Sequence, residues 1–127
     1  MSIDRRAVAA VAVGGVAGAS VRWLLVETMA EPTGWPWPIF IVNLAGSLLF
    51  GWLHGSDRPS STPHWWLGAT TGFCGALTTF STFAVEVATF LREDRFSLAL
   101  GYLVVSLAVG FGAFLAGSRL SRSVVQP

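Results

Sequence analysis

The stretch Gly72-Phe73-Cys74-Gly75-Ala76-Leu77-Thr78-Thr79-Phe80-Ser81-Thr82-Phe83 decides the fold of this chain. It lies within an uncharged run, residues 59–85, that is long enough to cross the hydrocarbon core of a membrane as a helix. The centre of the stretch, however, holds four hydroxyl side chains within five residues, preceded by two glycines. Inside a bilayer, irregular or polar backbone persists only where protein or a water-filled cavity surrounds it. The stretch therefore predicts a membrane-spanning helix that is broken halfway, with a site at the break.

The composition of the whole chain indicates a membrane protein. Of its 127 residues, 53% are apolar and only 12% are charged, whereas soluble domains carry about 25% charged residues. Charge-poor segments follow one another, and each can cross about 30 Å of hydrocarbon at about 1.5 Å per helical residue. We predict an all-α integral membrane protein with one four-helix domain, residues 1–127. Its spans are expected at about 7–27, 38–54, 65–91 and 96–117, with the third helix broken.

The sequence argues against nucleic-acid binding and against catalysis. It contains no lysine and no basic run, so it lacks the positive patch that binds phosphate backbones. Its single cysteine, Cys74, lies in a predicted span and is interpreted as a small buried apolar residue. The chain shows neither a nucleophile–base spacing nor a glycine-rich phosphate loop. We therefore expect no enzyme activity and no nucleic-acid partner.

The arginines encode the orientation of the chain only weakly. Four spans place both termini on one side of the membrane, and that side carries five of the eight basic residues. These five are Arg5, Arg6, Arg58, Arg119 and Arg122. The other three are Arg22, Arg92 and Arg95. So small a bias is compatible with insertion in both orientations.

Small residues four apart predict close helix packing. Gly14 and Gly18 share a face of the first span, and Gly68 and Gly72 share a face of the third. Packing within the subunit is one interpretation of these pairs, and packing between subunits is the other. Because four helices with one polar break are too few to enclose a selective path, we expect a homo-oligomer in the lipid bilayer.

Three kinds of group near the break suggest an ion site. Asn43 lies among apolar residues of the second span, where it either makes an interhelical hydrogen bond or donates toward an anion path. Phe80 and Phe83 share a helix face; they either pack or turn their positive ring edges, beside hydroxyls, toward a small dehydrated anion. The carbonyls of residues 75–78 lose helical partners wherever the span breaks, and freed carbonyls attract a monovalent cation.

Two charged residues lie within predicted spans. Arg22, late in the first span, is either an interfacial anchor or a positive charge at the mouth of an aqueous vestibule. Glu86, well inside the third span, is either paired structurally or takes part in transport. Its candidate partners are Arg92, Tyr102 and Ser106. The sequence leaves both choices open.

The motifs together match a known family. Residues 14–19 with Arg22, residues 42–47 and the opening stretch resemble the CrcB/Fluc fluoride channels over essentially the whole chain. Ala76 is a departure, because the family often has glycine there, and it bears on local backbone geometry only. The resemblance implies a dual-topology antiparallel homodimer, or a pair with a sister subunit of opposite orientation. Such a dimer would export fluoride passively across a prokaryotic plasma (inner) membrane and give resistance to fluoride.

The resemblance also implies roles for particular residues. Each dimer would hold two pores lined by both subunits, with Arg22 in the vestibule. The fluoride path would be lined by Asn43, Phe80, Phe83, Ser81, Thr82, Tyr102 and Ser106. The carbonyls of Gly75 and Thr78 would hold a structural sodium ion at the dimer centre. Fluoride, as the ion transported, is implied by the resemblance alone.

Two other functions remain open. A small multidrug or cation exporter also has four spans and dual topology. Proton-coupled export of that kind needs a carboxylate in the first span, where this chain has only Glu27, at the end. A non-transporting membrane anchor subunit would explain the helices and glycines, but not the hydroxyls and aromatic rings at the break.

Overall fold

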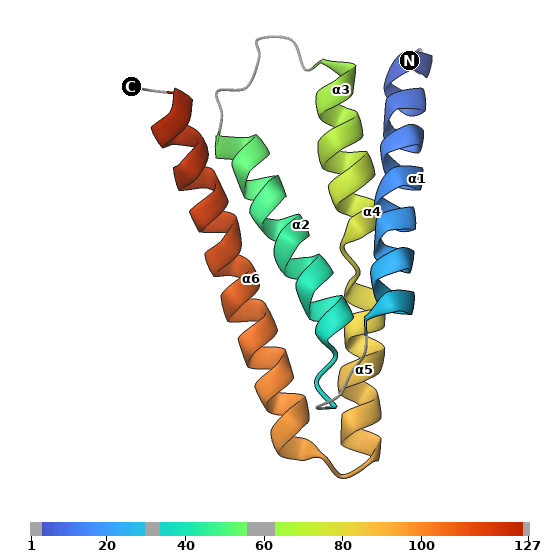
Figure 1. Cartoon of the computed structure of the whole chain (residues 1–127), viewed down its shortest axis with the longest axis vertical. Coiled ribbons are helices and arrows are strands. Elements are labelled where there is room, and N and C mark those ends of the chain that lie inside the picture. Colours follow the sequence, from blue (N-terminus) through green and yellow to red (C-terminus); the bar gives the residue numbers. More distant parts are fainter. Residues whose placement is uncertain (1–3, 30–33, 56–62, 126–127) are drawn as a thin grey trace.

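The computed structural model describes residues 4–29, 34–55 and 63–125, and within them every regular element is a helix (Figure 1). The elements are α1 (Arg5–Thr28), α2 (Trp37–Gly55), α3 (His64–Leu67), the π-helix η1 (Gly68–Cys74), α4 (Gly75–Leu77), α5 (Phe80–Arg92) and α6 (Phe96–Val125). Four helical segments are long and apolar enough to cross a membrane: Arg5–Thr28, Trp37–Gly55, His64–Arg92 and Phe96–Val124. The predicted all-α fold with four candidate spans is confirmed. The third span comprises α3, η1, α4 and α5.

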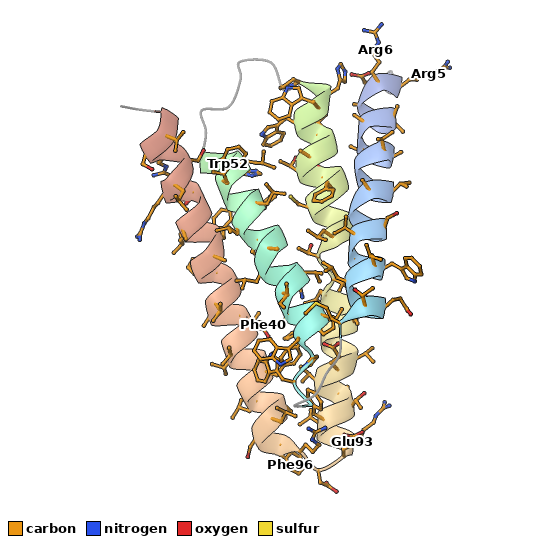
Figure 2. All side chains as sticks on the ribbon, viewed as in Figure 1. Arg5, Arg6, Phe40, Trp52, Glu93 and Phe96 are labelled. Atoms are coloured by element: carbon orange, nitrogen blue, oxygen red, sulfur yellow. The ribbon has the colours of Figure 1, made fainter. Side chains whose placement is uncertain are left out.

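The spans run alternately up and down, so both ends of the chain lie at the same end of the molecule (Figure 1). α2 packs along α6, while α1 packs along α3, η1 and α4; α5 contacts α6. Charged side chains occupy the two ends: Figure 2 shows Arg5 and Arg6 beside the N-terminus and Glu93 at the opposite end. Arg58 lies outside the described residues. The break is located between these two ends.

The glycine pairs pack helices closely together within the subunit. Gly14 and Gly18 of α1 lie so close to the backbone of Gly68 and Phe73 that a Cβ at either position would collide with a carbonyl oxygen. The second pair faces α1 in the same way, because a Cβ at Gly72 would lie 2.6 Å from a carbonyl oxygen of α1. Of the two interpretations of these pairs, the structure supports packing within the subunit. They hold α1 tightly against the first half of the third span.

The outer ends of the first and third spans are joined by one carboxylate. Asp4 Oδ1 caps α1 by accepting hydrogen bonds from the backbone N–H groups of Arg6 (3.0 Å) and Ala7 (3.3 Å). Its other oxygen, Oδ2, lies 2.9 Å from Nε2 of His64 at the start of α3. The side-chain hydrogen bond with His64 and the bonds from the cap lower the pKa of Asp4. Asp4 therefore links the two spans on the side of the N-terminus.

A π-helix lies one short helix, α4, before the break. In η1 the hydrogen bonds reach one residue further than in an α-helix, as where the N–H of Gly75 donates to the carbonyl of Thr70. Segments of this kind are rare and are frequently found at functional sites. The sequence does not predict this π-helix, because its residues also suit an ordinary helix.

Candidate ion site at the break in the third span

The third span breaks at Thr78 and Thr79, which lie between α4 and α5. Both residues have extended backbone, with φ −78° and ψ 152° for Thr78 and φ −145° and ψ 121° for Thr79. The break therefore lies among the clustered hydroxyls of the stretch 72–83, where the sequence predicts it. Two helix ends meet there: the carbonyl end of α4 and the N–H end of α5.

Asn43 of α2 holds the broken backbone in place. The backbone N–H of Thr79 donates to Asn43 Oδ1 at 2.8 Å, and Asn43 Nδ2 donates to the Thr79 carbonyl at 3.1 Å. Thr79 is buried, so the Asn43 amide supplies the acceptor that its N–H loses at the break and adds a donor to its carbonyl. The interhelical hydrogen bond predicted as one role for Asn43 is thus present. A side-chain amide has two N–H groups, and these bonds use one of them.

Thr79 also caps α5 and gathers the hydroxyls of the site. Its Oγ1 accepts a hydrogen bond from the backbone N–H of Thr82 at 3.2 Å. The same oxygen donates to Thr82 Oγ1 at 3.1 Å and lies 3.2 Å from Ser81 Oγ. The predicted site residues Ser81 and Thr82 are therefore brought together, and both are exposed in the subunit. Because the N-terminus of a helix is electrostatically positive, this end of α5 favours an anion at the break.

The carbonyl end of α4 faces the same break. The N–H of Thr79 bonds Asn43 instead of the carbonyl of Gly75, which consequently lacks its α-helical partner. The Thr78 carbonyl accepts a hydrogen bond from Arg22 Nη1 at 3.4 Å, which is long for such a bond. The side chain of Arg22 therefore reaches the break from α1. Oxygen acceptors and a guanidinium meet on this side of the site.

A cavity of about 440 Å³ lies between α2, the break, α5 and α6. Four residues predicted to line the fluoride path line it, namely Asn43, Phe80, Phe83 and Ser106, and so does Thr78, which was predicted to bind a cation. The Ser106 hydroxyl is buried and, among the residues that the structure describes, has no hydrogen-bond partner. The cavity thus combines aromatic walls with a few uncharged donors, as ligand sites commonly do. We refer to it as the pore cavity.

The two phenylalanines of the site differ in exposure. Phe80 is 76% exposed and Phe83 only 5%, although their ring centroids are 5.9 Å apart. Phe83 packs against the ring of Tyr102, with centroids 5.0 Å apart. Phe83 is therefore fixed by the core of the subunit, whereas Phe80 projects from it.

Tyr102 supports the site from behind. It is fully buried, and its O–H donates to Glu86 Oε2 at 2.7 Å. Glu86 thus has one of the partners that the sequence suggested. Tyr102 does not line the pore cavity, and neither do Ser81, Thr82 or Gly75.

A second cavity, of about 390 Å³, lies between α2 and the first half of the third span. Gly75 and Thr78, the two residues expected to bind a cation, both line it. We refer to it as the inner cavity. The predicted anion and cation residues thus lie on neighbouring cavities that share one wall.

Sequence reasoning missed part of the pore-cavity wall. α2 contributes Ser47 and Phe50, and α6 contributes Gly110, Phe111 and Phe114. One signal was available, because residues 106, 110 and 114 are four apart and therefore share a face of α6. That spacing alone does not say which face of α6 turns toward the break.

Comparison with known proteins identifies the family. Residues 9–118 match the family described as CrcB-like protein, Camphor Resistance (CrcB). This chain belongs to the CrcB family. The resemblance to the CrcB/Fluc family, which rested on the sequence motifs, is confirmed. With four helices long enough to span a bilayer, this CrcB protein is a multi-pass membrane protein.

Several relatives of this CrcB protein carry a functional name. "Fluoride-specific ion channel FluC 1" of Mycolicibacterium paratuberculosis is 40% identical over 124 residues, covering 95% of this chain and 94% of the relative. "Fluoride-specific ion channel FluC" of Bordetella avium is 47% identical over 103 residues, covering 78% and 79%. The FluC protein of Marinobacter nauticus is 42% identical over 120 residues, covering 92% and 89%.

Proposed function

We propose that this CrcB protein is a fluoride channel that lets fluoride leave the cell passively across a prokaryotic plasma (inner) membrane. Fluoride resistance would be its biological role. One observation carries the proposal: the break at Thr78 and Thr79 sets a helix N-terminus, hydroxyls and phenylalanine rings around one cavity. Relatives covering nearly the whole chain are named fluoride-specific ion channels, which supports fluoride as the ion.

The donors at the pore cavity suit an anion that must pass through. Fluoride is small and holds its water tightly, so it needs directed donors where it sheds that water. Asn43 has an N–H beyond the one it gives to Thr79, and the Ser106 hydroxyl is buried without a partner among the described residues. The ring edges of Phe80 and Phe83 add partial positive charge. None of these four groups carries a full charge, so binding stays weak enough for release.

We further propose that the channel is a dual-topology antiparallel homodimer. Phe80, Ser81 and Thr82 are exposed at the break, and so is Gly75. In a lone subunit, the hydroxyls of Ser81 and Thr82 would face lipid, which membrane proteins avoid. A second copy, inverted about a two-fold axis in the membrane plane, would cover them, because a break near mid-membrane stays near that depth on inversion. A sister subunit of opposite orientation would cover them equally.

We propose that the carbonyls of Gly75 and Thr78 hold a structural sodium ion. The donor chemistry fits, because unwound backbone carbonyls are the groups that bind sodium in broken membrane helices. Gly75 has lost its helical partner, and both residues line the inner cavity. Arg22 occupies one lone pair of the Thr78 carbonyl, and the second remains. When bound, the ion would supply fixed positive charge beside the anion path, while Asn43 keeps the backbone of the break in position.

Fluoride efflux from proteoliposomes that contain only this chain tests the proposal. A fluoride electrode should record release when a potassium ionophore clamps the voltage, and empty liposomes should release none. An intact fluoride gradient in the presence of the protein would instead indicate a non-transporting anchor. Efflux of a substituted cation without fluoride efflux would indicate a multidrug exporter. Cross-linking of inverted pairs and the oligomer mass test the dimer separately.

A further inference from the structure

Ser47 occupies the wall between the two cavities. Three residues line both the pore cavity and the inner cavity: Ser47, Phe50 and Thr78. The Thr78 hydroxyl already donates to the carbonyl of Cys74 at 2.9 Å, and Phe50 has no polar side-chain atom. Within the described ranges the half-buried Ser47 hydroxyl makes no hydrogen bond. Ser47 therefore places a hydroxyl O–H that donates no hydrogen bond in the wall between the two cavities.

The free state of this hydroxyl is unusual for a helical serine. Serine and threonine inside a helix commonly donate to the carbonyl four residues earlier. Ser20 does so in α1, with its Oγ 2.8 Å from the carbonyl of Val16, and Thr28 does so at 2.7 Å. In α2, Ser47 makes no such bond to Asn43. Its donor is consequently available to a ligand.

Two glycines leave space around Ser47. A Cβ at Gly46 would collide with Cγ2 of Thr78, so glycine there lets the break approach α2. On the opposite wall, a Cβ at Gly110 would lie 3.8 Å from Ser47 Oγ. The hydroxyl thus faces α6 at a position that has no side chain. The geometry leaves room for a small ligand beside the oxygen.

The neighbours of Ser47 extend a line of donors. Ser47 lies four residues after Asn43 on α2, so both lie on one helix face. Ser106 lies four residues before Gly110 on α6, and its buried hydroxyl also lacks a partner among the residues described. Two unpaired hydroxyls from different helices therefore line one cavity.

We propose that the Ser47 hydroxyl is a fluoride ligand. With Ser106 it would form an anion-binding site about one helical turn beyond Asn43, on the side of Phe50 and Phe114. We refer to it as the Ser47 site. This inference rests on the proposed channel function. A turn of helix rises about 5.4 Å, so an anion leaving Asn43 would find the next donor within a short step. A hydroxyl donates without a fixed charge, which allows the ion to be released again.

The test is a matched pair of variants, Ser47→Thr and Ser47→Val, in the full chain in liposomes. Threonine and valine have nearly the same shape, so the pair differs in the hydroxyl. Fluoride efflux is measured over a range of fluoride concentrations. We expect Ser47→Val to raise the half-saturating concentration about tenfold, as for one lost hydrogen bond to a charged ligand. Ser47→Thr should stay within about twofold of wild type, because it keeps the donor.

Ser20→Ala is the control, because that hydroxyl is exposed, bonds within α1 and lines neither cavity. Equal half-saturating concentrations for the valine and threonine variants would overturn the proposed Ser47 site and leave the channel proposal standing. Reduced flux in both, with an unchanged half-saturating concentration, would also overturn it, since that pattern reveals a packing role. Absence of fluoride efflux in the wild type would overturn the channel proposal itself. If the valine variant fails to fold, Ser47→Ala replaces it in the same comparison.

Discussion

Replacing Asn43 with alanine should destabilise the subunit strongly. The change removes the acceptor of the Thr79 N–H (2.8 Å) and the donor to the Thr79 carbonyl (3.1 Å). Thr79 is only 7% exposed, so water does not readily replace either bond. The Thr79 N–H would be left without a partner, which costs about 1–3 kcal/mol, whereas the carbonyl of this N-cap residue keeps its bond within α5 and loses only an additional one, worth about 0.5–1.5 kcal/mol. Together the two losses are a large share of the stability of a small domain, which is about 5–15 kcal/mol.

Thermal unfolding in detergent, followed by circular dichroism, measures this effect. Thr89→Val is a suitable control, because its hydroxyl is exposed and bonds the carbonyl of Val85 within α5. Asn43→Asp adds a second comparison: an ionised carboxylate accepts from the Thr79 N–H but cannot donate to the Thr79 carbonyl, whereas a protonated one does both. That variant should be less stable than wild type at neutral pH, recover in acid, and carry less fluoride at neutral pH. If Asn43→Ala melted together with the Thr89 control and carried fluoride at the wild-type rate, Asn43 would not be what holds the break.

Three further changes probe the rest of the site and the fold. Phe80→Ile should lower fluoride efflux without lowering the melting temperature, because the 76% exposed ring contributes little to the core; unchanged efflux would show that its ring edge plays no part. Tyr102→Phe should lower stability by about 1–3 kcal/mol, because it removes the 2.7 Å donor to Glu86 inside the protein; a thermal melt equal to wild type would contradict this. The pKa of Asp4 is lowered chiefly by its hydrogen bond with His64. The stability that the ionised Asp4 contributes is therefore fully present above pH 3.8, the ordinary pKa, and is lost as the pH falls through the lowered pKa of the folded state. Melting temperatures measured against pH should show this acid-dependent loss in wild type and not in Asp4→Asn; parallel curves would exclude the link.

The fold was largely predictable from the sequence, because hydrocarbon thickness fixes the length of each span and polar residues are costly within it. The same reasoning placed the break near the hydroxyls clustered from Thr78 to Thr82, since polar groups at that depth persist only where protein or a cavity surrounds them. It could not decide the role of Asn43, because a buried amide suits an interhelical bond and an ion site equally well. The structure shows the bond, and the part of Asn43 in the pore stays a prediction. The position of Ser47 in the wall of the pore cavity could not be predicted. It depends on which faces of α2 and α6 meet, and no spacing within one helix encodes that.

The wide helical segment Gly68–Cys74 carries one rigid attachment and leads to a second. Along the segment itself, at Gly68, Gly72 and Phe73, the third span lies tightly against α1. On its far side the chain must present the backbone of Thr79 to Asn43 in one orientation. Each residue of a regular helix turns its successors by about 100°, so shortening the widened segment by a single residue would swing everything downstream to another direction. Such a deletion mutant would lose either the close glycine contacts with α1 or the hydrogen bonds between Asn43 and Thr79.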